Sequence, residues 1–303
     1  MGLTSHRKAQ IALFVVILIA YLISMVSNLF IIMVVRLDFR LHTPMYFFLT
    51  NLSLLEMCFT SSVMPQMLAH LLAKTGRLSF LHCTFQMFIV CSLTCTEGLL
   101  LGAMAYDRYL AICCPLVYAV VMGRGRCLVL AAVSWVGGFL FSGMITVFIM
   151  QLPFCGPNSI NHFSCEYVMV IRLACADTSF AEAIILGAGV VILLAPLAAI
   201  LISYGLILMT VMRMSSGAGR SKAFSTCASH LMVVTIFYGC LIALYMRPRA
   251  GTDLSHDKHV AMFYSVIPPL LNPIIYTLRN KDVHAAVAKV LKTELLITNS
   301  EWS

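Results

Sequence analysis

Long runs of apolar residues alternate with short polar stretches along nearly the whole chain. Each run is close to the roughly 20 residues that an α-helix needs to cross the hydrocarbon core of a bilayer. The pattern predicts seven spanning helices, at Ile11–Val35, Met45–Ala69, Cys83–Tyr106, Cys127–Met150, Ala183–Val211, Ala223–Met246 and Val260–Leu278. A short amphipathic stretch, Lys281–Leu291, predicts a helix lying on the membrane surface. We therefore expect an all-α membrane protein: a seven-transmembrane helix bundle with a short C-terminal amphipathic surface helix, forming a single domain over residues 1–303.

Composition supports a chain whose outer surface contacts lipid. Hydrophobic residues make up 61% and charged residues 11% of the chain, whereas soluble domains carry about 25% charged residues. The formal net charge of +8 comes from short clusters between the apolar runs. Because these clusters form no basic stripe with interleaved aromatic residues, we expect no nucleic-acid partner. The first run, Ile11–Val35, is too long for the core of a cleavable signal peptide, so we expect it to remain as the first span.

The loops predict how the chain is oriented. Lys and Arg are more numerous in the loops on the side that follows the first, third and fifth spans, which favours a cytoplasmic C-terminus and an outer N-terminus in the plasma membrane. Cys83 begins the third span, and Cys155, Cys165 and Cys175 lie in the long loop between the fourth and fifth spans. All four fall on the expected outer side, where disulfides persist.

Five stretches at the helix ends carry a more specific signal than the hydrophobic pattern. An Asp-Arg-Tyr sequence alone would be weak, but the combination is specific. Together they resemble odorant (olfactory) receptors of the class II tetrapod type, within the rhodopsin-like G-protein-coupled receptor family. The stretches are Leu41–Leu49, Met104–Cys113, Ser203–Tyr204, Lys222–His230 and Pro269–Tyr276.

The resemblance covers nearly the whole chain and implies a receptor. Its expected partners are a small volatile odorant, a heterotrimeric G protein of the stimulatory olfactory type and membrane lipid, with no cofactor. By analogy with related receptors, Cys83 should pair with Cys165, and Cys155 with Cys175. The chain departs from the family at its start, since no Asn-x-Ser/Thr sequon precedes the first span; the family's longer outer tail is therefore expected to be missing here.

The inner ends of the helices hold the residues that the resemblance assigns to signalling. Arg108 is expected to be held by Asp107 at rest and to swing towards the G protein on activation; a simple snorkelling arginine is the alternative. Because Lys222 stands where an acid could otherwise lock Arg108, Tyr204 is the expected partner on the inner side. Asn272-Pro273 should form a hinge in the seventh helix, or merely a kink. The full set is Asp107, Arg108, Tyr109, Tyr204, Asn272, Pro273 and Tyr276.

Two carboxyl groups lie inside predicted spans. Glu97 stands eleven residues before Arg108, a rotation of about 1100°, so both side chains point to the same helix face. Glu56 should lie at a similar depth on the second helix. Ionisable groups at this depth usually face a partner or a wet cavity. Glu56 and Glu97 are either protonated, hydrogen-bonded carboxyl groups, or they form a small polar site with Asn28 and Asn272 that holds a cation or a proton.

A second group of residues predicts a ligand pocket in the outer half of the bundle. They share helix faces by 3.6-residue spacing and are mostly apolar, with a few hydroxyls and no charge. Helix-to-helix packing is the alternative for any one of them. Such a pocket suits a small, neutral volatile molecule. The set is Val90, Cys91, Thr94, Cys95, Tyr167, Ala188, Gly189, Ile192, Tyr238, Leu241, Ile242, Tyr245, Met262 and Ser265.

Other classes of protein fit the sequence less well. No phosphate-binding loop, zinc-protease motif or hydrolase triad is visible, so we expect no enzyme. A membrane transporter or channel is the alternative function, although the internal repeats of many transporters are missing. The seventh span holds no lysine for retinal, and Glu97 and Asp107 lie too deep to bind an amine. His162 and Glu166 flank Cys165, but a disulfide would occupy that sulfur, so we expect no metal site.

Overall fold

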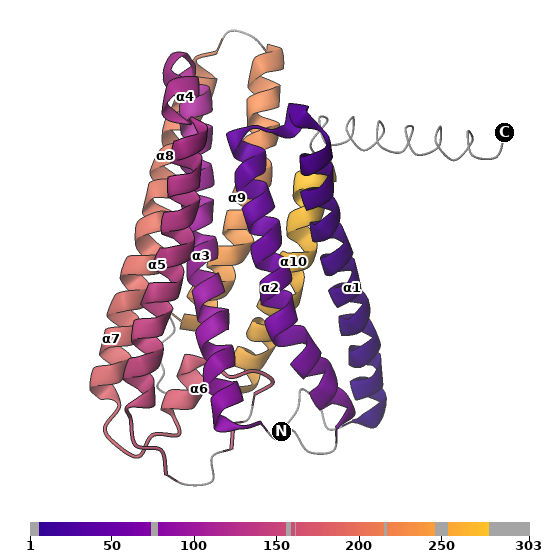
Figure 1. Cartoon of the computed structure of the whole chain (residues 1–303), viewed down its shortest axis with the longest axis vertical. Helices are drawn as coiled ribbons and strands as arrows, with labels where there is room; N and C mark the ends of the chain where they lie inside the picture. Colours follow the sequence, from indigo (N-terminus) through magenta and orange to yellow (C-terminus); the bar gives the residue numbers. More distant parts are fainter. Residues whose placement is uncertain are drawn as a thin grey trace, which may run out of the picture.

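The computed structural model describes residues 6–73, 78–155, 159–160, 162–214, 217–245 and 254–278, except for some side chains in the helices Gly217–Tyr245 and Leu254–Leu278. The described chain is a bundle of long helices running side by side (Figure 1). Short elements cap the bundle at both ends. The predicted fold class, an all-α membrane protein with seven spanning helices, is confirmed.

The helices follow the predicted spans and extend past them by a few residues at most ends. The helix α3 extends furthest past its predicted span, since it begins three residues before the apolar run and continues seven residues beyond it. The elements are α1 (Arg7–Leu37), η1 (Phe39–Leu41), α2 (Pro44–Leu72), α3 (Phe80–Cys113), α4 (Pro115–Val121), α5 (Arg124–Met150), α6 (Tyr167–Ile171), α7 (Ser179–Gly189), η2 (Val190–Leu194), α8 (Ala195–Met212), α9 (Gly217–Tyr245) and α10 (Leu254–Leu278).

Seven spanning segments can be assigned to these elements. The fifth is composite, since α7, η2 and α8 run on without a break from Ser179 to Met212. Six segments are long and apolar enough by themselves to cross a membrane, within the described residues. The seventh, α10, packs along α1, α2 and α9 and completes the bundle (Figure 1). The predicted surface helix, Lys281–Leu291, lies outside the described residues.

Proline explains two local features of the helices. Pro196 cannot donate a backbone N–H, and the five residues Val190–Leu194 just before α8 form a π turn, which re-registers the backbone bonds. Pro273 in α10 likewise leaves the carbonyl of Pro269 without its helical donor. Two side chains of α1 replace that donor: Ser24 Oγ at 3.0 Å and Asn28 Nδ2 at 3.3 Å. This is how a proline is accommodated in a span, and it ties α1 to α10.

The helix α3 lies at the centre of the bundle and packs against α2, α5 and α8 (Figure 1). The contact between α3 and α5 depends on Gly138. A Cβ atom built there would lie 2.2 Å from Thr96 Oγ1 and 2.8 Å from the carbonyl oxygen of Ser92. Such close backbone approach at a small residue is typical of helix pairs in membranes, where packing rather than water drives association.

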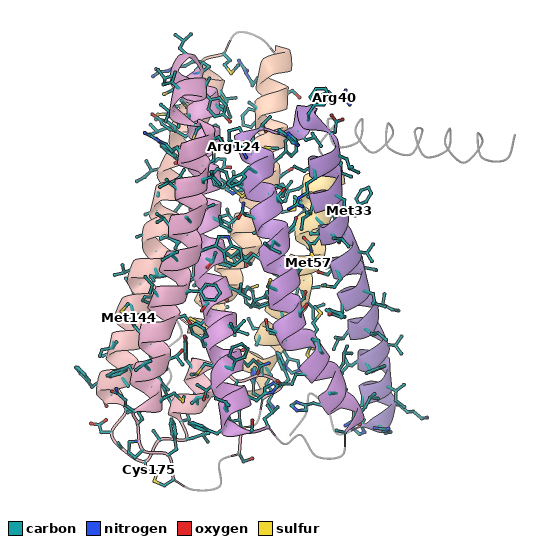
Figure 2. The ribbon with its side chains drawn as sticks, viewed as in Figure 1. Met33, Arg40, Met57, Arg124, Met144 and Cys175 are labelled. Carbon is teal, nitrogen blue, oxygen red and sulfur yellow. A yellow bond between two sulfur atoms is a disulfide. The ribbon has the colours of Figure 1, made fainter. Side chains whose placement is uncertain are left out.

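The two ends of the bundle differ in chemistry. Figure 2 shows Arg40 and Arg124 at one end and Cys175 at the other. Apolar side chains such as Met33 and Met144 project from the sides and are more than half exposed. These sides suit a lipid environment. The orientation itself, with the arginine end in the cytoplasm, stays a prediction.

Candidate ligand cavity and coupling residues

The loop between α5 and α7 folds back over one end of the bundle as a lid, defined here as His162–Ile171. A disulfide joins Cys83, at the start of α3, to Cys165 in the lid, with 5.4 Å between their Cα atoms. A second disulfide joins Cys155 to Cys175, with 5.8 Å between Cα atoms. The structure thus contains both pairs that the resemblance implied. The second pair closes a ring within the loop, beside an isolated β-bridge between Phe154 and Ala174.

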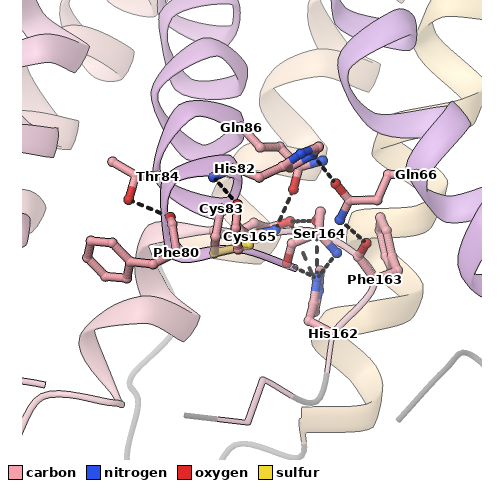
Figure 3. Close-up of a disulfide and its surroundings, with 12 residues drawn as sticks. Gln66, Phe80, His82, Cys83, Thr84, Gln86, His162, Phe163, Ser164 and Cys165 are labelled. Atoms are coloured by element: carbon pink, nitrogen blue, oxygen red, sulfur yellow. Dashed lines mark hydrogen bonds and ion pairs between the residues drawn. A yellow bond between two sulfur atoms is a disulfide. The ribbon is translucent and has the colours of Figure 1, made fainter. Parts of the chain in front are cut away.

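Two glutamines from different helices fix the lid in place (Figure 3). Gln86 of α3 accepts a hydrogen bond from the backbone N of Cys165 at 2.9 Å and donates one to the carbonyl of Ser62 at 2.9 Å. Gln66 of α2 donates to the carbonyl of Phe163 at 3.3 Å. Because these bonds satisfy buried backbone groups of an irregular segment, the lid is held in one position.

A cavity lies beneath the lid. It lies between the lid and the neighbouring helices and is partly open to the surroundings. Pockets for small molecules are usually lined mostly by apolar side chains. The lining residues come from α3, α5, the lid, α7, η2 and α9: Met87, Val90, Cys91, Thr94, Cys95, Phe141, Ile145, Cys165, Glu166, Tyr167, Ile185, Leu186, Gly189, Ile192, Leu193 and Leu241.

Some of the residues predicted from sequence to form a pocket lie in this cavity and others do not. The structure brings together Val90, Cys91, Thr94, Cys95, Tyr167, Gly189, Ile192 and Leu241. Ala188 packs next to the cavity, and Tyr238, Met262 and Ser265 pack elsewhere among the helices. The side chain of Tyr245 lies outside the described residues.

Ile242 was predicted to line the pocket, but it lies on the outside of the bundle. It is 41% exposed and does not line the cavity, whereas Leu241 is fully buried and does. Consecutive residues of an α-helix are about 100° apart. With Leu241 directed inward, Ile242 must point to the outside of the bundle.

The cavity wall carries hydroxyls and thiols that already have protein partners. Thr94 Oγ1 donates to the carbonyl of Val90 at 2.9 Å and lies 3.2 Å from the hydroxyl of Tyr264 on α10. Tyr167 Oη lies 3.0 Å from Ser142 Oγ. The sulfurs of Cys91 and Cys95 are 3.8 Å apart. A ligand would therefore meet a largely apolar surface with a few oriented polar atoms.

The expectation of an uncharged outer pocket is wrong in one respect, because Glu166 belongs to the cavity lining. Its Oε1 atom accepts a hydrogen bond from Ser164 Oγ at 3.3 Å and lies 4.0 Å from His162 Nε2. From the sequence alone, Glu166 was considered only as a possible metal ligand. The lid fold brings it to the cavity, since it adjoins the disulfide-bonded Cys165.

Sequence reasoning also missed the contribution of α5. Phe141 and Ile145 line the cavity, one turn apart, and the polar residues next to them in the sequence, Ser142 and Thr146, could have marked this part of the fourth span. Met87 could have been found. It lies four residues before Cys91 and seven before Thr94, which places all three on one face of α3.

The interior polar residues separate into two groups. Asn272 Nδ2 donates a short hydrogen bond to Glu56 Oε1, and both residues are buried. Glu97 Oε1 and Asn272 Oδ1 are buried without a hydrogen-bond partner in the described part of the chain. Asn28 instead bonds to the carbonyls of Ser24 and Pro269. Unpaired buried polar atoms are costly, so the oxygens of Glu97 and Asn272 are candidates for binding a further partner.

The opposite end of α3 holds the Asp-Arg-Tyr stretch. Asp107 accepts a hydrogen bond from Tyr118 Oη of α4 at 2.8 Å. No ion pair joins Arg108 to Asp107 in the described part of the chain, so the expected resting pair is not what the structure shows. The short helix α4 folds back along α3 and supplies a different partner for the carboxylate.

Tyr204 also has a partner other than the expected Arg108. Its hydroxyl lies 2.6 Å from His230 Nδ1, linking α8 to α9, and both side chains are buried. Tyr276 Oη and His230 Nε2 are buried polar atoms without a hydrogen-bond partner among the described residues. Tyr109 has only a weak contact, at 3.9 Å from the sulfur of Cys114. Several polar groups near Arg108 are thus available for new bonds.

No cluster of three or more His, Cys, Asp or Glu side chains that could hold a metal ion occurs among the described residues. The His162 ring bonds to Ser164 through Nδ1, and Cys165 is in a disulfide. These contacts give the lid residues a structural role.

The fold and this arrangement define a class of protein: a seven-helix membrane receptor, with a mainly apolar cavity under the lid and an Asp-Arg-Tyr stretch at the far end of α3. The sequence comparisons identify the family. A family model described as olfactory receptor matches residues 17–294. The chain belongs to the olfactory receptor family, and is therefore a G-protein-coupled odorant receptor.

Individual relatives resemble the chain over nearly its whole length. It is 47% identical to olfactory receptor-like protein OLF3 of Canis lupus familiaris, over 96% of this chain and 92% of the relative. It is 46% identical to olfactory receptor 2H2 of Homo sapiens, over 99% and 96%. It is also 46% identical to olfactory receptor 2C1 of Mus musculus, over 96% and 93%. The family is one of receptors rather than enzymes, and it is a family of multi-pass membrane proteins that couple to G proteins.

Proposed function

We propose that this receptor binds a small, mostly apolar, neutral volatile molecule in the cavity beneath the lid. On binding, it activates a stimulatory, olfactory-type G protein and raises cyclic AMP. The observation that carries the proposal is the cavity itself, which lies beneath the lid and has a mainly apolar lining. Burial of the ligand would contribute roughly 25 cal/mol per Å² of apolar surface, so a molecule of about ten heavy atoms should bind with modest affinity.

A neutral ligand fits the polar atoms in the wall. The hydroxyl of Thr94 directs its proton to the carbonyl of Val90 but can still accept a hydrogen bond, and the thiols of Cys91 and Cys95 are weak donors and acceptors. Glu166 already accepts a bond from Ser164 and lies close to His162. An ammonium group would need several acceptors at once, whereas most of the lining is apolar.

An odorant panel read out by cyclic AMP tests the ligand class. Thr94→Val removes a wall hydroxyl while keeping its shape, and should weaken the response to hydrogen-bonding neutral odorants by up to about tenfold. Thr235→Val is the matched control, because that hydroxyl bonds to its own helix at the carbonyl of Leu231 and the side chain is exposed. Activation by carboxylates or amines alone would show that the cavity does not select neutral molecules.

Arg108 is proposed to contact the G protein once the inner ends of α8 and α9 separate. Arg108→Ala should abolish the cyclic AMP response while the amount of receptor at the cell surface stays similar. Arg40→Ala, which removes a cation at the same end of the bundle, should leave the response in place. Full signalling by Arg108→Ala would refute the switch role. Absence of ligand-driven substrate flux would distinguish the receptor from a transporter or channel.

Glu56, Glu97 and Asn272 are proposed to hold a cation or a proton that favours the inactive state. The unpaired oxygens of Glu97 and Asn272 support this proposal. Replacing external sodium with choline during the same assay should increase basal cyclic AMP if the partner is sodium. An unchanged basal level would favour a proton.

A further inference from the structure

The outer end of the cavity is closed by the lid. Cys165 and Tyr167 line the cavity from this side and are 3% and 7% exposed. The disulfide to Cys83 and the hydrogen bond that the backbone N–H of Cys165 donates to Gln86 hold this segment against α3 (Figure 3). A molecule arriving from water would have to displace several buried contacts at once.

The side of the cavity formed by α7 is much more open. Within α7 and η2, Ala181 is the only buried residue. Leu186 lines the cavity and is nevertheless 52% exposed. Gly189 lies three residues further along and also lines it, and a Cβ atom built there would meet nothing within 4 Å. One flank of the cavity wall is therefore thin, and its most exposed side chain is Leu186.

This thin flank lies at membrane depth rather than at the water surface. Leu186 is seven residues from the start of α7, or about 10 Å along the helix axis. The α7–α8 segment is long and apolar enough to cross a bilayer. Side chains exposed on such a segment contact lipid, and a small apolar molecule concentrates in lipid for the same reason that it leaves water.

We propose that ligands reach the cavity from the bilayer, passing the exposed flank of α7 at Leu186, so that the receptor selects neutral molecules that partition into lipid. On this route the side chain of Leu186 is displaced, whereas the lid stays in place. The inference rests on the proposed ligand cavity and adds a route and a selection step to it. Charged molecules are excluded by the bilayer before they meet the cavity wall.

The free thiols of Cys91 and Cys95 line the cavity and report on access without any odorant. The receptor, in lipid nanodiscs, is treated with a neutral alkyl methanethiosulfonate or with a trimethylammonium one of similar size. A thiolate attacks the reagent sulfur, forms a mixed disulfide and releases methanesulfinate. Peptide mapping measures modification at each cysteine. Cys58, an exposed free thiol on α2, is the internal reference for the neutral reagent.

The neutral reagent should modify the cavity cysteines, and the charged reagent should leave them unmodified. Leu186→Trp should slow neutral modification about tenfold relative to Cys58, which corresponds to a barrier about 1.4 kcal/mol higher. Ile184→Trp is the matched control, because Ile184 is exposed on the same helix but does not line the cavity.

Equal rates with both reagents would overturn the proposal, since they would show access from water. An unchanged rate in Leu186→Trp would overturn it as well. If that variant fails to fold, the comparison of the two reagents on the natural sequence decides the question. Labelling needs no agonist, so a receptor that never raises cyclic AMP would refute the proposed function and leave the access route standing.

Discussion

The packing of α3 against α5 gives the sharpest prediction about stability, because it depends on a single missing side chain. Gly138→Ala adds one Cβ atom to α5. That atom would lie 2.2 Å from Thr96 Oγ1, 2.8 Å from the carbonyl oxygen of Ser92 and 2.9 Å from the backbone N of Thr96. The threonine hydroxyl could rotate away, but two of the three contacts are with backbone, so the helices themselves must separate.

The expected size follows from two opposing effects. Overpacking of a tight contact costs about 1–3 kcal/mol. Replacing a mid-helix glycine with alanine returns about 0.5–1 kcal/mol of helix stability. Because backbone atoms are involved, the cost should be near its upper end, leaving a net loss of about 1–2 kcal/mol. A change of this size lowers Tm by several degrees in a chain of this length.

The assay is thermal unfolding of the receptor in detergent, followed as an apparent Tm because membrane proteins often unfold irreversibly. Gly205→Ala in α8 is the matched control, since nothing lies within 4 Å of its added Cβ. Its Tm should stay the same or rise. Thr96→Ala should restore part of the loss in Gly138→Ala, because it removes one of the three close contacts. A Gly138→Ala variant as stable as Gly205→Ala would refute the packing argument.

Two further predictions concern the ends of the bundle. Tyr118→Phe removes the 2.8 Å hydrogen bond to the buried Asp107 carboxylate. Hydrogen bonds to charged groups contribute about 1.5–3 kcal/mol, so Tm should fall by several degrees. Tyr106→Phe, in which an exposed tyrosine loses its hydroxyl, is the control and should leave Tm unchanged. At the lid end of the bundle, the hydroxyl and backbone N of Ser179 hold the pKa of Asp177 below its ordinary value of 3.8. A lowered pKa stabilises the folded turn above pH 3.8, and this stabilisation is lost as the pH falls through the lowered value. Hydrogen exchange at the start of α7 should therefore quicken only in strong acid, and exchange in Asp177→Asn should lack this step. A step near neutral pH would contradict the assignment.

The sequence by itself determined the class of fold and most of the element positions. A bilayer requires about 20 apolar residues for each span, so the length and spacing of the apolar runs were sufficient to place the helices. The positions of Pro196 and Pro273 also determined two local features, the π turn before α8 and the free carbonyl in α10, because proline has no backbone N–H. The missing N–H of Pro273 guarantees a free carbonyl at Pro269, although nothing in the sequence said that Ser24 and Asn28 would satisfy it.

Only the tertiary structure decided which faces of the helices meet. Helical spacing fixes the angle between Leu241 and Ile242, but not the rotation of α9 about its axis, so the sequence could not tell which of them lines the cavity. Glu166 was beyond sequence reasoning because an irregular lid has no period from which to predict direction. Asp107 bonds to Tyr118 rather than to the predicted Arg108 because α4 folds back along α3. Periodicity describes each helix separately, whereas rotation, depth and loop path are set by the packing of all of them together.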